Sequence, residues 1–284
     1  MLPVNILLIT SINSRLIETN PAIAGFYARR DKVLNKVLIQ NVSSVETRTI
    51  SQACMLSNGI EVKRADISDL QHMTDDLNGF MPVGSVEFIR EFMKISGIIE
   101  PENISYPSSI KPMYQRKIEK TTAKEAKLID GSYFVKPVTT KLFTGFLMCD
   151  REFEDQFDIE QFAKYATLPQ ETEVWISEIV NFVSEYRYYV QDKKIIGMAR
   201  YDQNEYEDAP VPDAYFVKSV VDSLPFNHPY TVDIGVLDTG ESAVVECNDA
   251  WAIGLYGKAL APKDYLLFLS NRWQSILDNC QKLC

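Results

Sequence analysis

The sequence predicts an α+β protein in which a small α/β domain precedes a larger domain of antiparallel strands and helices. Within the first hundred residues, short apolar segments typical of buried strands alternate with helical segments. Pro101, Pro107 and Pro112 mark a linker, and beyond it strand-like segments follow one another across short turns, as in antiparallel sheets. We therefore expect one domain over residues 1–103 and a second over residues 104–284.

The composition restricts the class of protein. The chain has 284 residues, 46% of them hydrophobic, and a net charge of −10. This charge argues against nucleic acids and anionic membranes as partners, because both attract a positive surface. No run of about 18 apolar residues occurs, so we expect a cytoplasmic protein without a membrane span. Five cysteines, two histidines and no CxxC motif favour free thiols over a disulfide framework or a zinc site, and no segment indicates an oligomeric state.

The first domain is expected to contain a parallel sheet. The nearly all-apolar residues 4–10 are typical of a strand buried on both faces, and shorter strands are expected over residues 37–39 and 60–62. A helix is expected over residues 45–57, and another begins after the N-cap Ser85. The domain has neither a GxGxxG nor a GxxxxGK[ST] motif, so neither a dinucleotide fingerprint nor a P-loop explains a phosphate site.

A lysine at the end of a strand is the first candidate site residue. Residues 133–137 are expected to form this strand, which places Lys136 beside a polar loop, and residues 145–148 return as its partner. The loop holds Thr139, Thr140, Lys141 and Thr144. An ammonium group, hydroxyls and loop amides together suit phosphate oxygens. The alternative is a strand-end lysine whose charged group simply reaches solvent.

An amphipathic helix and a meander of antiparallel strands follow. The helix is expected over residues 153–166, and the candidates for its buried side are Phe153, Phe157 and Phe162. The strands are expected over residues 174–182, 184–190 and 194–201. Alternation places Glu185 and Arg187 on one face of the second strand, and such a pair is most often a surface ion pair.

The second domain is organised around a hairpin near its end. Residues 230–236 and 243–251 are rich in β-branched and aromatic residues, and an Asp-Thr-Gly turn lies between them. Because side chains alternate across a strand, Glu246 and Asn248 share a face that Asp233 on the partner strand can reach. Two carboxylates and an amide oxygen suit Mg²⁺ or Mn²⁺. The alternative is a surface hairpin whose acidic residues are solvated.

Two helices complete the expected second domain. One covers residues 214–223, and the other begins near Lys263 and closes the chain. Apolar residues recur along the closing helix at a spacing of three and four, at Leu266, Leu269, Trp273, Ile276 and Cys280. This spacing predicts a face that docks on another part of the protein.

The order of these parts resembles the ATP-grasp superfamily. A strand-end lysine before a proline, an acidic segment with a second glutamate seven residues further on, and an aspartate followed by Glu-x-Asn occur over residues 104–260. The wording of residues 133–137, 141–145 and 246–251 is most similar to a bacterial and phage-associated branch thought to contain peptide or protein ligases. The resemblance implies an ATP-grasp fold preceded by the small α/β domain. Its two α+β subdomains, a lid over about 111–173 and a core over about 174–284, would clasp ATP.

The resemblance also implies roles for individual residues. Lys136 would touch the phosphates, with Lys117 as a candidate for the family's earlier lysine. Adenosine contacts would come from Glu178 near the adenine amino group, the backbone of Ile179 and Val180 at the adenine edge, and Glu185 at the ribose. The implied metal ligands are Asp233, Glu246 and Asn248.

Two departures from the family pattern add basic residues to this set. Only Gly145 stands where many relatives have a glycine-rich loop, so Lys141 and the loop threonines are assigned to the phosphates. Thr231 stands where many relatives carry an arginine two residues before the metal-binding aspartate, so that role is assigned to Arg187 or Arg200. Ion pairs of these arginines with Glu185 or the acidic loop after residue 201 are the alternative.

The implied activity is an ATP- and Mg²⁺-dependent ligation of a carboxylate to an amine through an acyl phosphate, forming a carbon–nitrogen bond. The substrates would be small molecules, peptides or proteins that carry these groups. Lysines and metal ions can supply the positioning and charge neutralisation that phosphoryl transfer needs. A kinase-like phosphotransferase on the same fold and a nucleotide-binding module without turnover are the alternatives.

Overall fold

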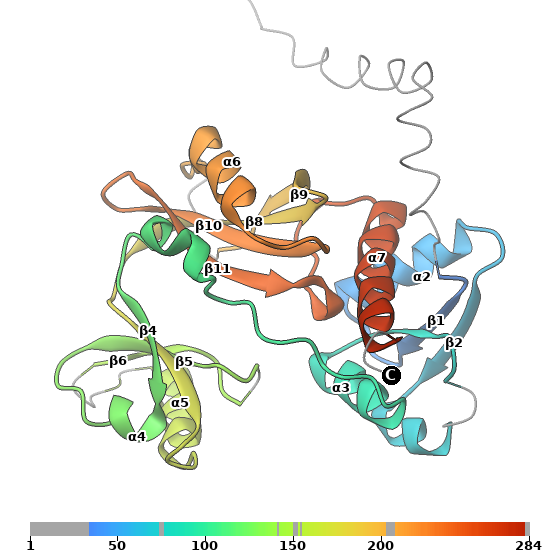
Figure 1. Ribbon diagram of the computed structural model, residues 1–284, viewed down its shortest axis with the longest axis horizontal. Helices are drawn as coiled ribbons and strands as arrows, with labels where there is room; N and C mark the ends of the chain where they lie inside the picture. Colours follow the sequence, from blue (N-terminus) through green and yellow to red (C-terminus); the bar gives the residue numbers. More distant parts are fainter. Residues whose placement is uncertain are drawn as a thin grey trace, which may run out of the picture.

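The computed structural model describes residues 34–73, 77–140, 142–149, 153, 155–202 and 208–281. Three structural units are visible: the first domain, a lid sheet with its helices, and a core sheet covered by a helix (Figure 1). The strand expected over residues 4–10 lies outside the described residues.

The first domain is built on a parallel sheet, as predicted. Its elements are β1 (Lys36–Gln40), α2 (Val45–Met55), β2 (Glu61–Ala65), β3 (Met81–Val83) and α3 (Val86–Ile95). The strand order is β2-β1-β3, and β1 pairs in parallel with both neighbours. The side chain of Ser85 accepts the backbone N–H of Phe88, which confirms the predicted N-cap of α3. A 3₁₀ helix, Ile67–His72, lies between β2 and β3.

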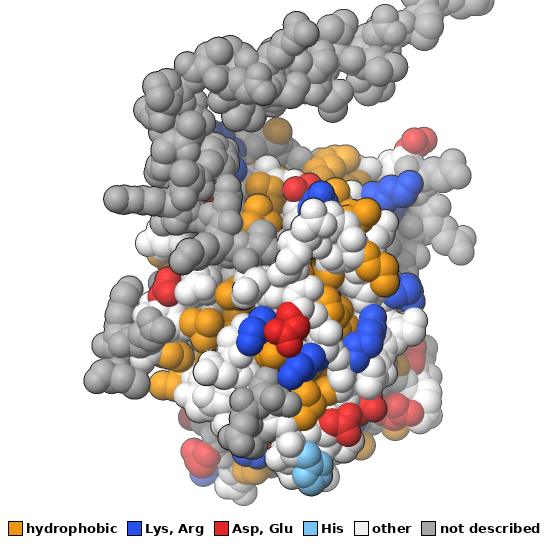
Figure 2. Space-filling view, turned by 90° about the vertical axis from the view of Figure 1, so that its right-hand side faces the viewer, with side chains coloured by type: hydrophobic (Ala, Val, Ile, Leu, Met, Phe, Trp, Pro, Cys, Tyr) orange, Lys and Arg blue, Asp and Glu red, His pale blue; other side chains and the backbone are white. Residues whose placement is uncertain are grey.

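One face of the first domain is a mixed polar surface (Figure 2). The ammonium groups of Lys36 and Lys63 lie 5.3 and 5.1 Å from the centre of the Phe80 ring, and Lys36 also pairs with Glu61 at 3.8 Å. Basic, acidic and apolar side chains therefore lie side by side here. Within the described ranges, no helix combines the length and apolarity needed to cross a bilayer.

The lid sheet is antiparallel, with the order β4-β7-β5-β6. The unit contains β4 (Ile118–Thr122), α4 (Ala123–Ala126), β5 (Tyr133–Pro137), β6 (Phe146–Met148), α5 (Gln156–Ala166) and β7 (Glu173–Ser177). The prediction that Phe157 is buried is wrong, because its side chain is 47% exposed. The inward stripe of α5 runs through Asp158, Gln161 and Tyr165, and Phe157 lies beside it in the first turn.

The core sheet is also antiparallel, with the order β11-β10-β8-β9. Its elements are β8 (Phe182–Gln191), β9 (Lys194–Arg200), α6 (Ala214–Ser223), β10 (Tyr230–Leu237) and β11 (Ser242–Asp249). Tyr186 and Tyr188 share an apolar cluster with the buried residues of α6, whereas Glu185 and Arg187 lie on the other face. The predicted alternation along β8 is therefore confirmed. A 3₁₀ helix, Ser108–Tyr114, packs against β11 and α6.

The closing helix α7 (Pro262–Gln281) lies between the core sheet and the first domain (Figure 1). Leu266, Leu269, Trp273 and Ile276 are each at most 7% exposed, and they belong to the same apolar cluster as β1, α2 and α3. The predicted docking face is confirmed, and its partner is the first domain. The end of the chain thus fixes this domain beside the hairpin β10–β11 and the 3₁₀ helix Ala250–Ala252 that follows it.

Candidate active site

A cavity of about 1250 Å³ is lined by the lid sheet, the core sheet and the first domain together with its linker. Segments far apart in the sequence contribute to its wall, which is why the site requires the complete fold. Seven of the expected site residues line it: Lys136, Glu178, Ile179, Val180, Glu185, Glu246 and Asn248. The hairpin β10–β11 and the strand-end lysine, which the sequence singles out separately, therefore face one space.

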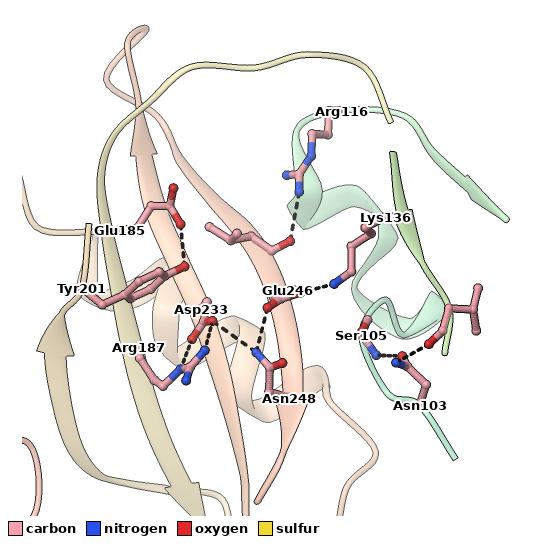
Figure 3. Close-up of polar contacts among 12 residues, drawn as sticks. Asn103, Ser105, Arg116, Lys136, Glu185, Arg187, Tyr201, Asp233, Glu246 and Asn248 are labelled. Carbon is pink, nitrogen blue, oxygen red and sulfur yellow. Dashed lines mark hydrogen bonds and ion pairs between the residues drawn. The ribbon is translucent and has the colours of Figure 1, made fainter. Parts of the chain in front are cut away.

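The hairpin places its polar residues through a β-bulge. Asp233 is directly opposite Glu246, but Ile234 is opposite Val244, so Val245 is an extra residue in β11. The Arg116 guanidinium donates to the carbonyls of Val244 and Val245 at 2.8 and 2.9 Å, and thus holds the bulge from the side of the lid (Figure 3). Glu246 and Asn248 consequently reach the cavity on the face where Asp233 also lies.

Asp233 lies behind the cavity wall in a buried ion pair. Its side chain is 0% exposed, and it accepts two hydrogen bonds from Arg187, at 2.8 and 2.6 Å. The amide nitrogen of Asn248 lies 3.2 Å from Asp233 and 3.1 Å from Glu246, so Asn248 connects the two carboxylates (Figure 3). Burial raises the pKa of Asp233, and Arg187 counteracts this effect.

Lys136 spans the cavity from the lid to the core. Its ammonium group pairs with the Glu246 carboxylate and lies 5.1 Å from the centre of the Tyr106 ring (Figure 3). Burial would lower the pKa of Lys136 and raise that of Glu246, but the pair reverses both effects. Lys136 is therefore held as a cation and Glu246 as an anion, which is the state that phosphate and metal binding require.

The loop after Lys136 is held at several points. Gly145 approaches β5 so closely that a Cβ atom there would lie 2.5 Å from the Phe134 ring. The backbone N–H of Thr144 donates to Gln161 of α5 at 2.9 Å. From the first domain, Arg90 donates to the carbonyl of Thr140 at 2.8 Å. Lys141 lies outside the described residues.

The segment after β7 provides the expected adenosine contacts. The Glu178 carboxylate accepts the backbone N–H of Lys117 at 2.8 Å, and the Glu178 N–H donates to the Lys117 carbonyl at 3.1 Å. These two bonds fix the connection between the subdomains and leave Ile179 and Val180 along the cavity wall. The Lys117 ammonium group pairs with Glu119 at 2.9 Å and its side chain is 63% exposed, so the cation that this segment brings to the cavity is Arg116.

Glu185 lies at the far side of the same wall. It accepts a hydrogen bond from the Tyr201 hydroxyl, and its backbone N–H donates to Asp202 at 2.8 Å. Burial raises the pKa of Glu185, the bond from Tyr201 lowers it, and the neighbouring Asp233 raises it further. An acceptor so held fits a ligand hydroxyl.

The two candidate arginines are used differently. Arg187 pairs with Asp233 and not with Glu185, and its guanidinium lies 5.5 and 5.0 Å from the ring centres of Tyr201 and Tyr256. Arg200 forms a fork with Asp202, at 2.8 and 2.7 Å, which is the acidic-loop ion pair considered as its alternative. Arg200 is not among the described residues that line the cavity.

A family comparison identifies this arrangement. Residues 114–267, more than half of the chain, match a family model described as an ATP-grasp domain, family 2 of its clade. The chain belongs to this ATP-grasp family. No curated protein matches the chain in sequence.

Solved structures agree with the ATP-grasp fold. The L-amino acid ligase from Bacillus licheniformis is 12% identical, with 85% of this chain and 75% of that chain covered, at a TM-score of 0.51. The ADP complex of an N5-carboxyaminoimidazole ribonucleotide synthetase is 11% identical, with 83% and 76% covered, at 0.50. The D-alanine–D-alanine ligase from Bacillus anthracis is 14% identical, with 88% and 99% covered, at 0.49. Identities this low concern the fold alone.

The donor set of the ATP-grasp site fits a hard divalent cation. Among the described residues, no group of three or more His, Cys, Asp or Glu side chains is arranged to hold a metal ion. The set here consists of the Glu246 carboxylate and the Asn248 amide at the cavity wall, with Asp233 joined to both through Asn248. Oxygen donors of this kind suit Mg²⁺ or Mn²⁺.

Three contributors to the ATP-grasp cavity are missing from the sequence-based set: Arg116, Tyr106 and Tyr201. Arg116 stands beside the candidate Lys117, so the signal was present but the strand register was not. Tyr106 lies in the proline-marked linker and Tyr201 at the end of β9, where the sequence has no motif. Only the fold brings these tyrosines to Lys136 and Glu185.

Proposed function

We propose that this protein is an ATP- and Mg²⁺-dependent carboxylate–amine ligase. The observation that carries the proposal is the meeting of Lys136, Glu246 and Asn248 in one cavity with the Glu178 segment and Glu185. A cation for phosphate, oxygen donors for a metal and an acceptor for a ribose thus face the same space. The proposal includes a division at residues 103 and 104, with a lid and a core in the second part, and a cytoplasmic location.

The nucleotide is proposed to lie along the wall from Glu178 to Lys136. The backbone of Ile179 and Val180 would meet the adenine edge, with Glu178 near its amino group, and Glu185 would accept from the ribose. Lys136 would hold the phosphates, and Arg116 stands beside it in the place proposed for Lys117.

Glu246, Asn248 and Asp233 are proposed to hold one or two Mg²⁺ ions, which would neutralise charge on the transferred phosphoryl group. A carboxylate oxygen of the substrate attacks the γ-phosphorus, and the bond to the ADP oxygen breaks. The amine nitrogen then attacks the acyl carbon, phosphate leaves, and the amine loses a proton. Lys136 accompanies the negative charge in both steps, while Arg187 holds Asp233 in place.

The substrates are proposed to be a small molecule, peptide or protein that offers the carboxylate, and an amine. The L-amino acid ligase among the structural neighbours supports this reaction class. A kinase is the second candidate, because the same cavity could present a hydroxyl to ATP. Nucleotide binding without turnover is less well supported, since both Glu246 and Asn248 face the cavity.

Binding separates the phosphate claim from the rest. Titration calorimetry of the Lys136→Ala variant in the presence of Mg²⁺ should find ATP bound much more weakly than by the parent, with adenosine affinity unchanged. Lys120→Ala is a matched control, because Lys120 pairs with Glu173 on the lid sheet and is not a lining residue of the cavity. Equal ATP affinity in the parent and Lys136→Ala would remove this lysine from the phosphate site.

Trapping separates ligase from kinase. The parent is incubated with ATP, Mg²⁺, pooled carboxylic acids and peptides, and hydroxylamine in place of the amine. A ligase yields a hydroxamate together with ADP and phosphate, because hydroxylamine intercepts the acyl phosphate. A stable phosphorylated product without a hydroxamate would favour the kinase.

A further inference from the structure

The linker between the first domain and the lid forms part of the cavity wall. The backbone N–H of Cys247, between Glu246 and Asn248, donates to the Ser105 carbonyl at 2.9 Å, so the linker runs along β11. Asn103 accepts from the Ser105 N–H at 2.8 Å and donates to the Val138 carbonyl, in the loop after Lys136, at 2.9 Å (Figure 3). The linker therefore holds the lid loop and the core hairpin at the same time.

Tyr106 is the residue that this linker turns toward the cations. Its ring centre lies 5.1 Å from the Lys136 ammonium group, and Arg116 lies close enough to lower the pKa of the phenol, which burial raises. Two aromatic edges fix the ring from behind: Tyr114, with ring centres 5.6 Å apart, and Trp175, with ring centres 5.1 Å apart. The orientation of the Tyr106 ring is therefore set by packing.

We propose that Tyr106 is a positioning residue that holds the Lys136 ammonium group at the phosphate position of the cavity. The face of an aromatic ring carries negative potential and attracts an ammonium ion. A lysine side chain has four rotatable bonds, so restraining it in advance removes part of the entropy loss on binding. Lys136 has two partners in the structure, Glu246 and the ring, and the ring remains when phosphate replaces the carboxylate.

This inference rests on the proposed function, because it assumes that ATP phosphates meet Lys136. It predicts that Tyr106→Leu binds ATP about three- to tenfold more weakly than the parent, the range of a partly buried cation–π contact, with adenosine affinity unchanged. Tyr106→Phe, which keeps the ring, should restore the parent ratio of ATP to adenosine affinity. A residue that only packs would alter both ligands together or neither.

A ring variant tests the interaction without changing shape. Tyr106→trifluorophenylalanine, introduced by codon suppression, keeps the packing against Tyr114 and Trp175 but removes the negative potential of the ring face. It should bind ATP as weakly as Tyr106→Leu, and it keeps the test valid where the leucine variant fails to fold. ATP affinity equal to that of Tyr106→Phe would overturn the proposal.

A control addresses looseness of the linker. Tyr114→Phe removes the hydrogen bond from the Tyr114 hydroxyl to the Pro107 carbonyl, 2.9 Å long, and leaves the Tyr106 ring on Lys136. It should lower the melting temperature and leave the ATP to adenosine ratio unchanged; a matching loss of ATP affinity would overturn the positioning role. If Lys136→Ala loses ATP binding while Tyr106→Leu does not, only this inference fails. A parent that binds no ATP would overturn the proposed function as well.

Discussion

The buried pair of Arg187 and Asp233 gives the largest expected change in stability. Asp233 is 0% and the Arg187 side chain 9% exposed, and two charge-assisted hydrogen bonds of 2.8 and 2.6 Å join them. In the Arg187→Met variant, the remaining hydrogen-bond partner of the carboxylate is the Asn248 amide at 3.2 Å. Removing one member of such a pair destabilises a protein by about 3–5 kcal/mol.

This loss is a large part of the roughly 5–15 kcal/mol that stabilises a typical domain. At about 2–4 °C per kcal/mol for a chain segment of this size, the melting temperature should fall by about 6–20 °C. The double variant Arg187→Met/Asp233→Leu should recover much of the loss, because it leaves no unpaired charge. ATP turnover should be lost in both variants, since neither retains the polar group behind Asn248.

Thermal and urea unfolding, followed by circular dichroism, measure the single and double variants together. A fall of less than about 1 kcal/mol for Arg187→Met would contradict the burial argument, because only exposed pairs contribute so little. A double variant as unstable as the single one would show that packing around Tyr201 and Tyr256, and not the unpaired carboxylate, causes the loss.

Three further predictions follow from the cavity. Glu246→Gln and Asn248→Ala should each lower Mg²⁺-dependent ATP turnover at least about tenfold to a hundredfold with an unchanged dichroism spectrum, because they remove oxygen donors and little packing; retained turnover would make the hairpin merely structural. Arg116→Lys should weaken Mg²⁺-ATP binding more than Lys117→Ala, because a lysine cannot bridge both carbonyls of the bulge; calorimetry giving the opposite order would return this role to Lys117. Because the pKa of Glu185 is raised in the fold, its ionisation opposes folding, so stability should decline as the pH rises from the ordinary glutamate range through the raised pKa. Glu185→Gln should remove that decline in a pH series of urea unfolding curves, and an unchanged decline would refute it.

The elements that depend on local patterns could be predicted from the sequence. The hairpin β10–β11 follows from β-branched residues around an Asp-Thr-Gly turn, and α3 follows from Ser85 and its apolar spacing. Phe157 fails because the side of a helix that is buried depends on what covers it, and α5 buries Gln161 to hold Thr144. Apolarity alone does not contain that information.

The parts of the site that depend on strand order could not be predicted in this way. Arg187 meets Asp233 because β8, and not its sequence neighbour β9, pairs with β10. Arg116 faces the cavity and Lys117 does not, because successive side chains of a strand alternate, and a shift of one residue exchanges them. Residue type therefore indicated a basic group at this point, while the register chose which one.

The charges of the cavity indicate why the site needs a metal as well as a lysine. Glu246 is already balanced by Lys136, and Asp233 by Arg187, so neither cation is surplus when nucleotide phosphates enter. If Lys136 moves to the phosphates, Glu246 is left as an anion at the cavity wall, where an unpaired charge is unfavourable. A divalent cation between Glu246, Asn248 and the phosphates satisfies the carboxylate that Lys136 leaves. Transfer of Lys136 to the phosphates and metal binding at the hairpin are thus two halves of one exchange, and the ring of Tyr106 accompanies the lysine through it.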